Sequence, residues 1–458
     1  MLRQTIYALS SAPGKAGVAV VRVSGPRAKQ ALTSCTAGNA RSSWRPRQAY
    51  FRSIQHPHTR APLDRGLVLW FPGPHSFTGE DIVELHVHGG NAVVRSVLDA
   101  LGDLPDFRPA EQGEFAKRAF DNDKLDLTEL EGLADLLNAE TEAQRQLALR
   151  QAEGGLRVPY ERWREQIIHC MAIMEAVIDF GEDEQIDEGA TDTAVQNVID
   201  MRNAILKHLD DKRVGEIVRN GVKVTIVGPP NAGKSTLLNM LAKREAAIVS
   251  DIPGTTRDVV EVTLNLGGYP VVISDTAGLR ESTDVIEKEG MKRALSRLDQ
   301  ADIKICLIPL TDWDRLDQIV HDVVDKNTFV ILTKQDLTDD SMMEKARDQV
   351  AQKARGVWAL SCRTGQGVDP FLNDMIGLLK TTFDDAISSP ALITQARHRR
   401  HLQDCVEALD QFLATPSEEI VLAAEELRQA ANALGRITGR VDVEDVLDAL
   451  FSQFCIGK

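Results

Sequence analysis

A buried strand, a glycine-rich loop and an amphipathic helix follow one another at residues 222–241, and no other segment restricts the fold as much. Val222 to Val227 is an apolar run, the loop reads GPPNAGKS, and helical periodicity begins at Thr236. The loop matches G-x-x-x-x-G-K-S/T in the strand–loop–helix context that gives this pattern its meaning. Glycines let backbone N–H groups approach a phosphate, Lys234 supplies positive charge, and Ser235 offers a hydroxyl to Mg²⁺. The segment predicts a doubly wound α/β domain that binds a nucleotide.

Two further motifs indicate that this nucleotide is GTP. DTAG ends an apolar strand, so Asp275 would hold Mg²⁺ through water and the Gly278 N–H would meet the γ-phosphate. TKQD follows another apolar strand, and the Asp336 carboxylate can accept hydrogen bonds from guanine. The usual pattern there is NKxD. Because Thr333 lacks the carboxamide that normally braces the base and the P-loop, we expect weaker nucleotide binding with guanine preference retained.

The remaining predicted GTP contacts lie in the loops around these motifs. Ser361-Cys362-Arg363 stands where a backbone N–H usually meets the guanine oxygen, and Thr256 is the expected second Mg²⁺ ligand after Ser235. The full set predicted to bind GTP is Asn231, Ala232, Gly233, Lys234, Ser235, Thr236, Ser250, Asp251, Ile252, Pro253, Gly254, Thr255, Thr256, Asp275, Thr276, Ala277, Gly278, Thr333, Lys334, Asp336, Ser361, Cys362 and Arg363.

Leu279 raises the question of how such a site would hydrolyse GTP. Many switches carry a glutamine at this position that orients the attacking water, and leucine has no polar atom for that task. A monovalent cation beside the phosphates would neutralise developing charge, with Asn231 as an oxygen ligand and residues 250–256 completing its shell. Three carboxylates downstream would place the water: Glu281, Asp284 and Glu287.

The rest of the chain divides by the period of its apolar residues. Residues 1–121 carry short apolar or alternating runs between Gly-Pro turns, which predicts a small α+β domain. Residues 122–215 and 380–458 have the helical period, whereas residues 216–379 repeat strand, loop and helix. We therefore expect an α/β domain inserted into a discontinuous helical domain, and the 458 residues suit roughly three domains.

Particular elements are expected within these segments. Thr128 and Glu131 predict a capping box at the first long helix. A second helical stripe is expected to be packed core: Tyr160, Trp163, Ile167, Met171, Met174 and Ile178. The predicted strands are Val18 to Val23, Leu67 to Phe71, Ile82 to His88, Val222 to Val227, Val271 to Ile273, Ile303 to Ile308, Phe329 to Leu332 and Val357 to Leu360.

Charge and cysteine content limit the partners. A formal net charge of -15 means that contact with a nucleic acid needs a local basic patch or another protein. The best such patch is residues 397–401, RHRRH, which is alternatively a solvated helix start. The six cysteines form no CxxC pair, which argues against zinc and disulfide frameworks. No apolar run approaches the ~18 residues of a membrane span, and no leader is evident, so we expect a cytoplasmic protein.

The chain resembles the MnmE (TrmE) family of tRNA-modification GTPases over essentially its whole length. The segments that carry the resemblance are PGKAGVAVVRVSG, FPGPHSFTGEDIVELHVHGG, EFAKRAFDNDKLDLTELEGLADL, PNAGKS, GTTRD, DTAGLRE and the terminal FCIGK. The resemblance implies an N-terminal folate-binding domain that dimerises, a discontinuous helical domain and an inserted GTPase domain.

The resemblance also implies an answer to the problem of Leu279. Members of this family use K⁺ in place of an arginine finger, and the matching ligand positions are Asn231, Ser250, Ile252 and Thr255. The family's catalytic glutamate aligns with Glu287. Two GTPase domains that meet across a homodimer would order these loops.

The chemistry that the resemblance implies is addition of an aminomethyl-type group to the five position of the wobble uridine of certain tRNAs. The one-carbon unit would come from a methylene- or formyl-tetrahydrofolate, and the partner would be the FAD-binding protein MnmG (GidA), in a heterotetramer or larger complex. Arg22, Glu84, Lys124 and Lys458 match folate-contacting positions. Cys455 matches the family's terminal cysteine, either as a nucleophile toward the uridine or as a structural contact.

Some alternatives stay open from the sequence. The chain is alternatively a ribosome-assembly GTPase, or a folate-dependent one-carbon transferase in which the GTPase domain only regulates. His86 and His88 alternate on a predicted strand and share a face, so they form either part of a metal site or a packed, folate-adjacent pair.

Overall fold

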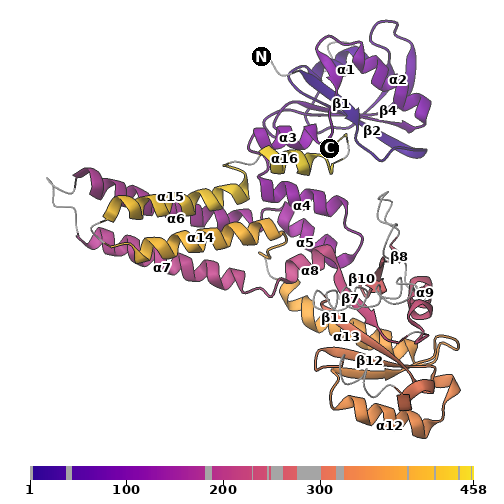
Figure 1. Ribbon diagram of the computed structural model, residues 1–458. Helices are drawn as coiled ribbons and strands as arrows, with labels where there is room; N and C mark the ends of the chain where they lie inside the picture. The colour runs from indigo at the N-terminus through magenta and orange to yellow at the C-terminus, as the bar shows by residue number, and fades with distance from the viewer. Residues whose placement is uncertain are drawn as a thin grey trace, which may run out of the picture. The chain divides into compact units, whose positions relative to one another are not determined.

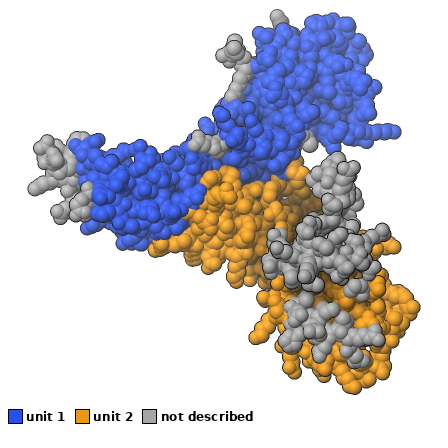
Figure 2. All heavy atoms as spheres, in the orientation of Figure 1, with its two compact units in different colours: residues 1–134, 151–199, 404–458 blue, residues 135–150, 200–403 orange. Residues whose placement is uncertain are grey.

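The computed structural model describes residues 4–37, 44–180, 188–229, 231–244, 247–248, 261–275, 301–315, 324–388, 391–416, 419–441, 444–454 and 456–457. Its internal contacts divide the chain into two compact units (Figure 2). Unit one comprises residues 1–134, 151–199 and 404–458, and unit two comprises residues 135–150 and 200–403. The unit boundaries fall inside four helices, so the chain passes from one unit to the other along helical segments.

The N-terminal part of unit one is a six-stranded sheet with helices packed on one face (Figure 1). The strands lie in the order β3-β4-β5-β2-β1-β6, and only the β1–β6 pair is parallel. Alternate residues such as Val21, Val68 and Leu85 point toward the helices and are fully buried. The elements are β1 (Thr5–Leu9), β2 (Ala16–Ser24), α1 (Ala28–Cys35), β3 (Tyr50–Gln55), β4 (Pro62–Phe71), β5 (Ile82–Gly89), α2 (Asn91–Gly102), β6 (Phe107–Pro109) and α3 (Glu114–Asp121).

Helices make up the remainder of unit one and the segments that lead out of it. They are α4 (Leu127–Leu137), α5 (Glu142–Ala152), α6 (Arg157–Phe180), α7 (Glu188–Leu209), α14 (Ala396–Ala414), α15 (Ile420–Thr438) and α16 (Glu444–Phe451). Helices α6 and α15 pack along each other, as Figure 1 shows. The predicted stripe on α6 is core at Tyr160, Trp163, Ile167 and Met174, which are at most 5% exposed, whereas Ile178 near the helix end is 39% exposed.

The capping box of α4 lies two residues earlier than predicted. Asp126 Oδ1 accepts a hydrogen bond from the Glu129 N–H at 2.8 Å, and Glu129 Oε2 accepts one from the Asp126 N–H at 2.8 Å. The Thr128 hydroxyl also donates to Asp126 Oδ1. The prediction of Thr128 with Glu131 is wrong because two overlapping pairs fit the same spacing, and the aspartate, which precedes the first helical residue, takes the cap.

Unit two contains a seven-stranded sheet in the order β13-β12-β11-β7-β10-β9-β8. The five strands from β13 to β10 are parallel, and β9 and β8 extend the sheet in antiparallel fashion. The elements are α8 (Val214–Asn220), β7 (Val222–Val227), α9 (Lys234–Arg244), β8 (Ala247–Ile248), β9 (Glu261–Leu266), β10 (Tyr269–Asp275), β11 (Ile303–Pro309), η2 (Leu310–Arg315), β12 (Thr328–Thr333), η3 (Gln335–Leu337), α12 (Asp340–Ala351), β13 (Gly356–Ala359) and α13 (Val368–Ile387). This confirms the predicted doubly wound fold.

The strand order reverses at β7, which lies between β10 and β11. In such sheets the crevice beyond the carboxyl ends of the strands at this reversal is where ligands bind. The P-loop follows β7 directly, so the topology places it at the crevice.

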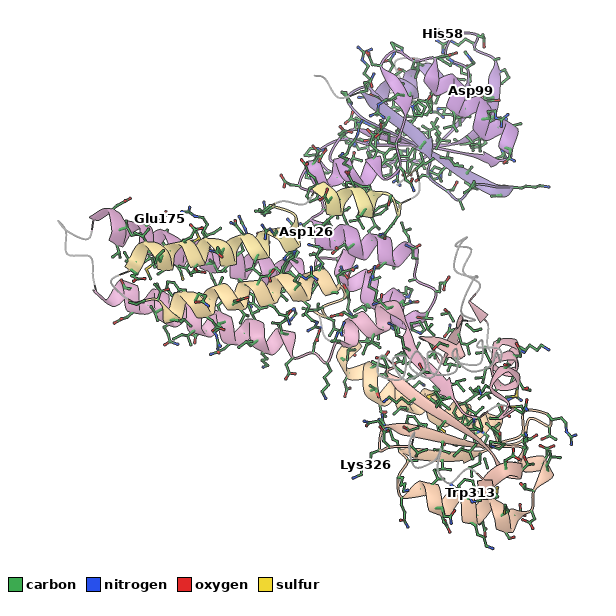
Figure 3. The ribbon with its side chains drawn as sticks, in the orientation of Figure 1. His58, Asp99, Asp126, Glu175, Trp313 and Lys326 are labelled. Carbon is green, nitrogen blue, oxygen red and sulfur yellow. The ribbon has the colours of Figure 1, made fainter. Side chains whose placement is uncertain are left out.

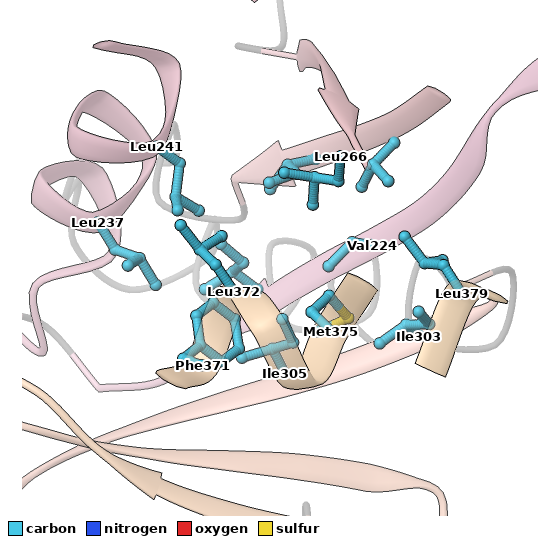
Figure 4. A pocket seen from close by; sticks show the side chains of 13 residues that line it. Val224, Leu237, Leu241, Leu266, Ile303, Ile305, Phe371, Leu372, Met375 and Leu379 are labelled. Atoms are coloured by element: carbon cyan, nitrogen blue, oxygen red, sulfur yellow. The ribbon is translucent and has the colours of Figure 1, made fainter. Parts of the chain in front are cut away.

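A small cavity of about 10 Å³ lies inside unit two (Figure 4). Its lining is entirely apolar and comes from the sheet and from helices α9 and α13, with Val224, Leu237, Phe371 and Met375 among the contributors. A buried water needs about this much room together with two or more polar partners, which this lining does not offer. The cavity is therefore a packing gap in the core rather than a ligand site.

Within the described ranges, no helix has both the length and the apolar character that crossing a membrane requires.

Candidate functional site

The P-loop takes a conformation that its sequence makes accessible. A Cβ atom at Gly228 would lie 2.5 Å from the Leu307 carbonyl oxygen of β11, so only glycine fits there. Asn231 and Gly233 have φ of 61° and 95°, the left-handed region that glycine and asparagine enter most readily. The Lys234 ammonium donates to the carbonyl oxygens of Gly228 at 2.7 Å and Pro229 at 2.9 Å, so it lies over the loop. Ser235 and Thr236 follow in the first turn of α9.

Thr333 reaches the P-loop. Its side chain is 2% exposed at the carboxyl end of β12, and its hydroxyl donates to the Ala232 carbonyl oxygen at 2.8 Å. The expectation that a threonine at this position makes no stabilising contact with the P-loop is therefore wrong. The expectation of weaker nucleotide binding stays a prediction.

The two segments predicted to recognise guanine lie side by side. Arg363 Nη2 is 2.9 Å from Asp336 Oδ2, and Ser361 is 1% exposed beneath the same loop. A hydrogen bond from Ser361, and then the charge of Arg363, hold the pKa of the Asp336 carboxyl below its usual range. Lys334, at the start of this loop, has a backbone φ of 62°. In the neighbouring segment, burial raises the pKa of the Cys362 thiol. Asp336 is thus an ionised acceptor at neutral pH.

Asp275 is the last residue of β10 and stands opposite Ile226 of β7 in the parallel register. The carboxyl ends of the two strands therefore meet at the same sheet edge, and DTAG begins beside the P-loop. The remaining predicted residues of the GTP site and of the catalytic and terminal positions lie outside the described residues: Ser250, Asp251, Ile252, Pro253, Gly254, Thr255, Thr256, Thr276, Ala277, Gly278, Leu279, Glu281, Asp284, Glu287, Cys455 and Lys458.

In unit one the structure brings Arg22 and Glu84 together. They are opposite each other on β2 and β5, and Arg22 Nη2 lies 3.1 Å from Glu84 Oε1. The guanidinium also lies over the rings of Phe77 and Phe115, at 5.4 and 5.9 Å from their centroids. His86 Nε2 is 3.2 Å from the other carboxylate oxygen of Glu84. The Phe115 ring is fully buried, so the half-buried Phe77 ring and the paired charge are the groups that a flat polar ring can contact.

A loop connects this ion pair to Lys124. Phe77 touches Arg22 at one side of the loop, and Gly79 stands at the other, where a Cβ would lie 3.3 Å from Lys124 Cγ. The Asn122 amide donates to the Thr78 carbonyl oxygen at 2.6 Å and holds the loop in place. Phe77 was not among the predicted site residues, because an aromatic residue in a loop carries no periodic signal.

The C-terminal tail returns to the strand that neighbours Arg22. The Ser10 hydroxyl donates to the Gly457 carbonyl oxygen at 2.9 Å, and a Cβ on Gly457 would lie 2.1 Å from the Leu9 carbonyl oxygen. Leu9 pairs with Val21 in the β1–β2 ladder. Phe454, 1% exposed, anchors the tail in a cluster with α3 and α4. The tail therefore ends close to the strand that carries Arg22.

The two histidines of β5 have carboxylate partners instead of a metal set. His86 pairs with Glu84, and His88 Nδ1 lies 2.8 Å from Asp64 Oδ1. Across the part of the chain that the structure describes, no group of three or more His, Cys, Asp or Glu side chains is arranged to hold a metal ion. His86 lies beside Glu84, one of the predicted folate residues, whereas the His88 side chain is 71% exposed and pairs with Asp64, so the interpretation as a packed pair fits His86 alone.

The basic stretch 397–401 is largely structural. Arg399 Nη2 and Nε lie 2.6 Å from Asp211 Oδ1 and Glu216 Oε1, and its Nη1 donates to the Leu209 carbonyl oxygen. His398 is fully buried, whereas Arg400 is exposed. Neither a nucleic-acid patch nor a solvated helix start describes Arg399, which ties α14 to the α7–α8 region.

A strand–P-loop–helix unit with an ionised carboxylate on the loop after a nearby strand is the arrangement of a GTP-hydrolysing enzyme of the P-loop class. Two family models match the chain: the MnmE helical domain over residues 127–455 and the GTP-binding protein TrmE N-terminus over residues 5–124. The chain belongs to the MnmE family of tRNA modification GTPases.

Individual relatives are similar in sequence to this chain over nearly its full length. The tRNA modification GTPase MnmE of Parvibaculum lavamentivorans is 50% identical over 457 residues, which cover 99% of this chain and 100% of that protein. The mitochondrial 5-taurinomethyluridine-tRNA synthase subunit of Danio rerio is 47% identical over 469 residues, with 99% and 93% covered. The Homo sapiens protein of that name is 45% identical over 467 residues, with the same coverage.

Proposed function

We propose that this chain hydrolyses GTP in order to modify the wobble uridine of certain tRNAs at its five position. The group added is of the aminomethyl type, carboxymethylaminomethyl or related, and its one-carbon unit comes from a tetrahydrofolate derivative. An FAD-binding partner, MnmG (GidA), completes the enzyme in a heterotetramer or larger complex with a homodimer of this chain. The observation that carries the proposal is full-length identity of 50% to a protein named tRNA modification GTPase, with the P-loop and guanine motifs retained.

At the GTP site, different residues are proposed to bind the phosphates, Mg²⁺ and guanine. Lys234 exchanges its two loop carbonyls for outer phosphate oxygens, and the hydroxyls of Ser235 and Thr256 are the ligands for Mg²⁺. Asp275 holds the same ion through water. Asp336 selects guanine.

The proposed ligands for K⁺ are oxygen donors from the P-loop and from residues 250–255. Asn231 offers an amide oxygen from a loop position with φ of 61°, and Ser250, Ile252 and Thr255 offer hydroxyl and backbone oxygens. When bound, the cation supplies positive charge where negative charge develops during hydrolysis. This is the charge that an arginine finger supplies in other GTPases, whereas the water-positioning role that Leu279 cannot fill is left to Glu287.

Hydrolysis in KCl and in NaCl at matched ionic strength tests this part of the proposal. General screening is nearly equal in the two salts, so a difference in rate isolates a size-selective site. We expect a clear preference for K⁺. Equal slow rates in both salts would contradict the cation site and leave a partner-supplied group as the source of the charge.

Glu287 is the proposed group that positions the attacking water. We expect Glu287→Ala to bind GTP normally and to hydrolyse it about two decades more slowly or worse, on the scale of lost catalytic positioning. Binding is measured with a fluorescent GTP analogue, and hydrolysis is measured as phosphate release. Hydrolysis by the variant at the parent rate would remove Glu287 from the mechanism.

In unit one, Arg22, Glu84, Lys124 and Lys458 are the proposed folate contacts. Two features support the assignment: Arg22 pairs with Glu84 and lies over the Phe77 ring, and the loop that carries Phe77 also carries Gly79, at which a Cβ would lie 3.3 Å from Lys124 Cγ. The hydrogen bond from Ser10 to Gly457 also supports the assignment, because Ser10 follows the strand that pairs with the strand of Arg22. Cys455 is proposed either as nucleophile toward the uridine or as a structural contact, and loss of modification in Cys455→Ser with GTP hydrolysis intact would favour the first role.

A further inference from the structure

The residue that departs from the usual guanine motif, Thr333, occupies a position between the two halves of the nucleotide site. Its hydroxyl is buried and donates at 2.8 Å to the carbonyl oxygen of Ala232, which is 101 residues away in the chain and itself 0% exposed. Three residues later, Asp336 faces Ser361 and Arg363. One side chain thus joins the loop expected to hold phosphate to the loop expected to hold guanine.

The hydrogen bond fixes the peptide plane at the centre of the P-loop. In a trans peptide the carbonyl of one residue and the N–H of the next point in opposite directions. Because Thr333 draws the Ala232 carbonyl toward β12, the Gly233 N–H points away from that strand. Ala232 lies between Asn231 and Gly233, whose φ values of 61° and 95° are outside the range that most residues prefer. The bond holds this uncommon backbone conformation in place.

The hydroxyl has a single hydrogen to donate, and the Ala232 carbonyl takes it. A carboxamide in this position has enough donors and acceptors to serve both the P-loop and the base, whereas the threonine serves only the P-loop. Base selection is then left to Asp336 and the segment that begins at Ser361.

We infer that Thr333 is a positioning residue that sets the affinity for the nucleotide by holding the P-loop in its phosphate-binding conformation, without selecting the base. The inference rests on the proposed function and deepens it at the same site. In this chain, support of the P-loop and recognition of the base are then assigned to different residues, whereas the usual asparagine serves both.

The same strand offers a matched control. Thr328 stands at the opposite end of β12, is 0% exposed, and its hydroxyl donates to Asp325 Oδ1 at 2.6 Å. Thr328→Val and Thr333→Val remove the same group from the same strand at equal burial. Only Thr333 touches the P-loop.

The experiment titrates the full-length parent and each variant with fluorescent GDP and with fluorescent IDP, which lacks the 2-amino group that Asp336 would read. We expect Thr333→Val to weaken GDP binding by about tenfold or more, the scale of one buried hydrogen bond lost with its acceptor left unpaired. The ratio of GDP to IDP affinity should stay at the parent value, and Thr333→Ser should restore binding. Thr328→Val should bind like the parent even where its thermal midpoint falls.

Thr333→Ala is measured beside Thr333→Val, so that failure of one variant to fold leaves the other. Parent-like binding by the Thr333 variants would overturn the inference, and so would an equal loss of affinity in Thr328→Val. A changed GDP to IDP ratio would assign Thr333 to base selection and overturn it as well. A parent chain that binds neither nucleotide would overturn the proposed function itself, and the inference with it.

Discussion

Asp126, labelled in Figure 3, is a buried residue, and its two carboxylate oxygens have different surroundings. Oδ1 caps α4, whereas Oδ2 is buried with no hydrogen-bond partner among the described residues. Burial raises the pKa of this carboxyl to about 6, although the hydrogen bonds from Glu129 and Thr128 oppose the rise. Burial of the Asp126 carboxyl at the cap therefore lowers the stability of the fold whenever this carboxyl is ionised.

This cost predicts a pH-dependent gain for Asp126→Asn. Because the pKa is higher in the folded state than in the unfolded state, protonation stabilises the fold as pH falls from about 6 toward the ordinary value of 3.8, and the ionised group is a penalty above pH 6. Asparagine keeps the capping oxygen without charge. We expect the free energy of unfolding of the variant to exceed that of the parent by about 1–3 kcal/mol at pH 8. This difference should become smaller below pH 6.

Denaturant titrations at pH 5, 6 and 8 measure this difference. Asp123→Asn, an exposed aspartate three positions earlier, is the control and should show no such trend. A gain for Asp126→Asn that is constant across this range would show that the carboxyl does not titrate there.

At the residue scale, sequence indicates which residues are candidates for the site, but not which contacts they make. TKQD, the P-loop and the Ser361 segment were all located, yet the direction of the Thr333 hydroxyl depends on Ala232, 101 residues away. The cap at Asp126 was missed because Asp126 and Thr128 both fit a capping pattern and only the first helical residue decides between them. Local spacing defines candidates, and packing selects among them.

At the element scale, Arg399 ties α14 to the end of α7 and to α8 within unit two. Arg399 of α14 pairs with Asp211 and Glu216 and donates to the last residue of α7, with side chains that are 14%, 9% and 5% exposed. Removing the guanidinium takes a charged partner from the buried Asp211, whereas Glu216 keeps its pair with Arg213 at 2.6 Å, so the cost should lie near the low end of the about 3–5 kcal/mol typical of a broken buried pair.

We therefore expect Arg399→Met to lose most of that amount. Arg400→Met, which removes an exposed charge from the next position of the same helix, should change the free energy of unfolding by less than about 0.5 kcal/mol. Denaturant unfolding of both variants and the parent gives the comparison. Equal losses in the two variants would show that Arg399 acts through overall charge rather than through its buried contacts.

The elements themselves followed from periodicity where the signal was strong. All eight predicted strands are present, because parallel and buried strands are continuous apolar runs. Strands β1, β3, β6, β8 and β9 were not predicted, although the Gly267-Gly268 turn between β9 and β10 is a hairpin signal. Strand β9 reads EVTLNL, an alternation too short to stand out, and its place is set by pairing with β10.

At the scale of the whole molecule, the limits of the predicted domains remain predictions, and the packing shows why sequence cannot set them. Ala143 and Leu147 of α5 and Val214 and Val218 of α8 belong to the same hydrophobic cluster as the β7–β10 sheet. The Ala143 N–H also donates to the Gly268 carbonyl oxygen at the β9–β10 turn. The helical period of apolar residues predicts that one face of a helix is buried, but it does not predict which unit the helix packs against.

The measurement that tests the central claim most directly is nucleoside mass spectrometry of tRNA from cells that lack this chain, with the parent chain and the Lys234→Ala variant returned separately. The account predicts that the modified wobble uridine disappears without the chain, returns with the parent, and stays absent with the variant, because Lys234 is the proposed phosphate ligand. Unchanged wobble uridines in cells without the chain would contradict the assignment of tRNA as the substrate.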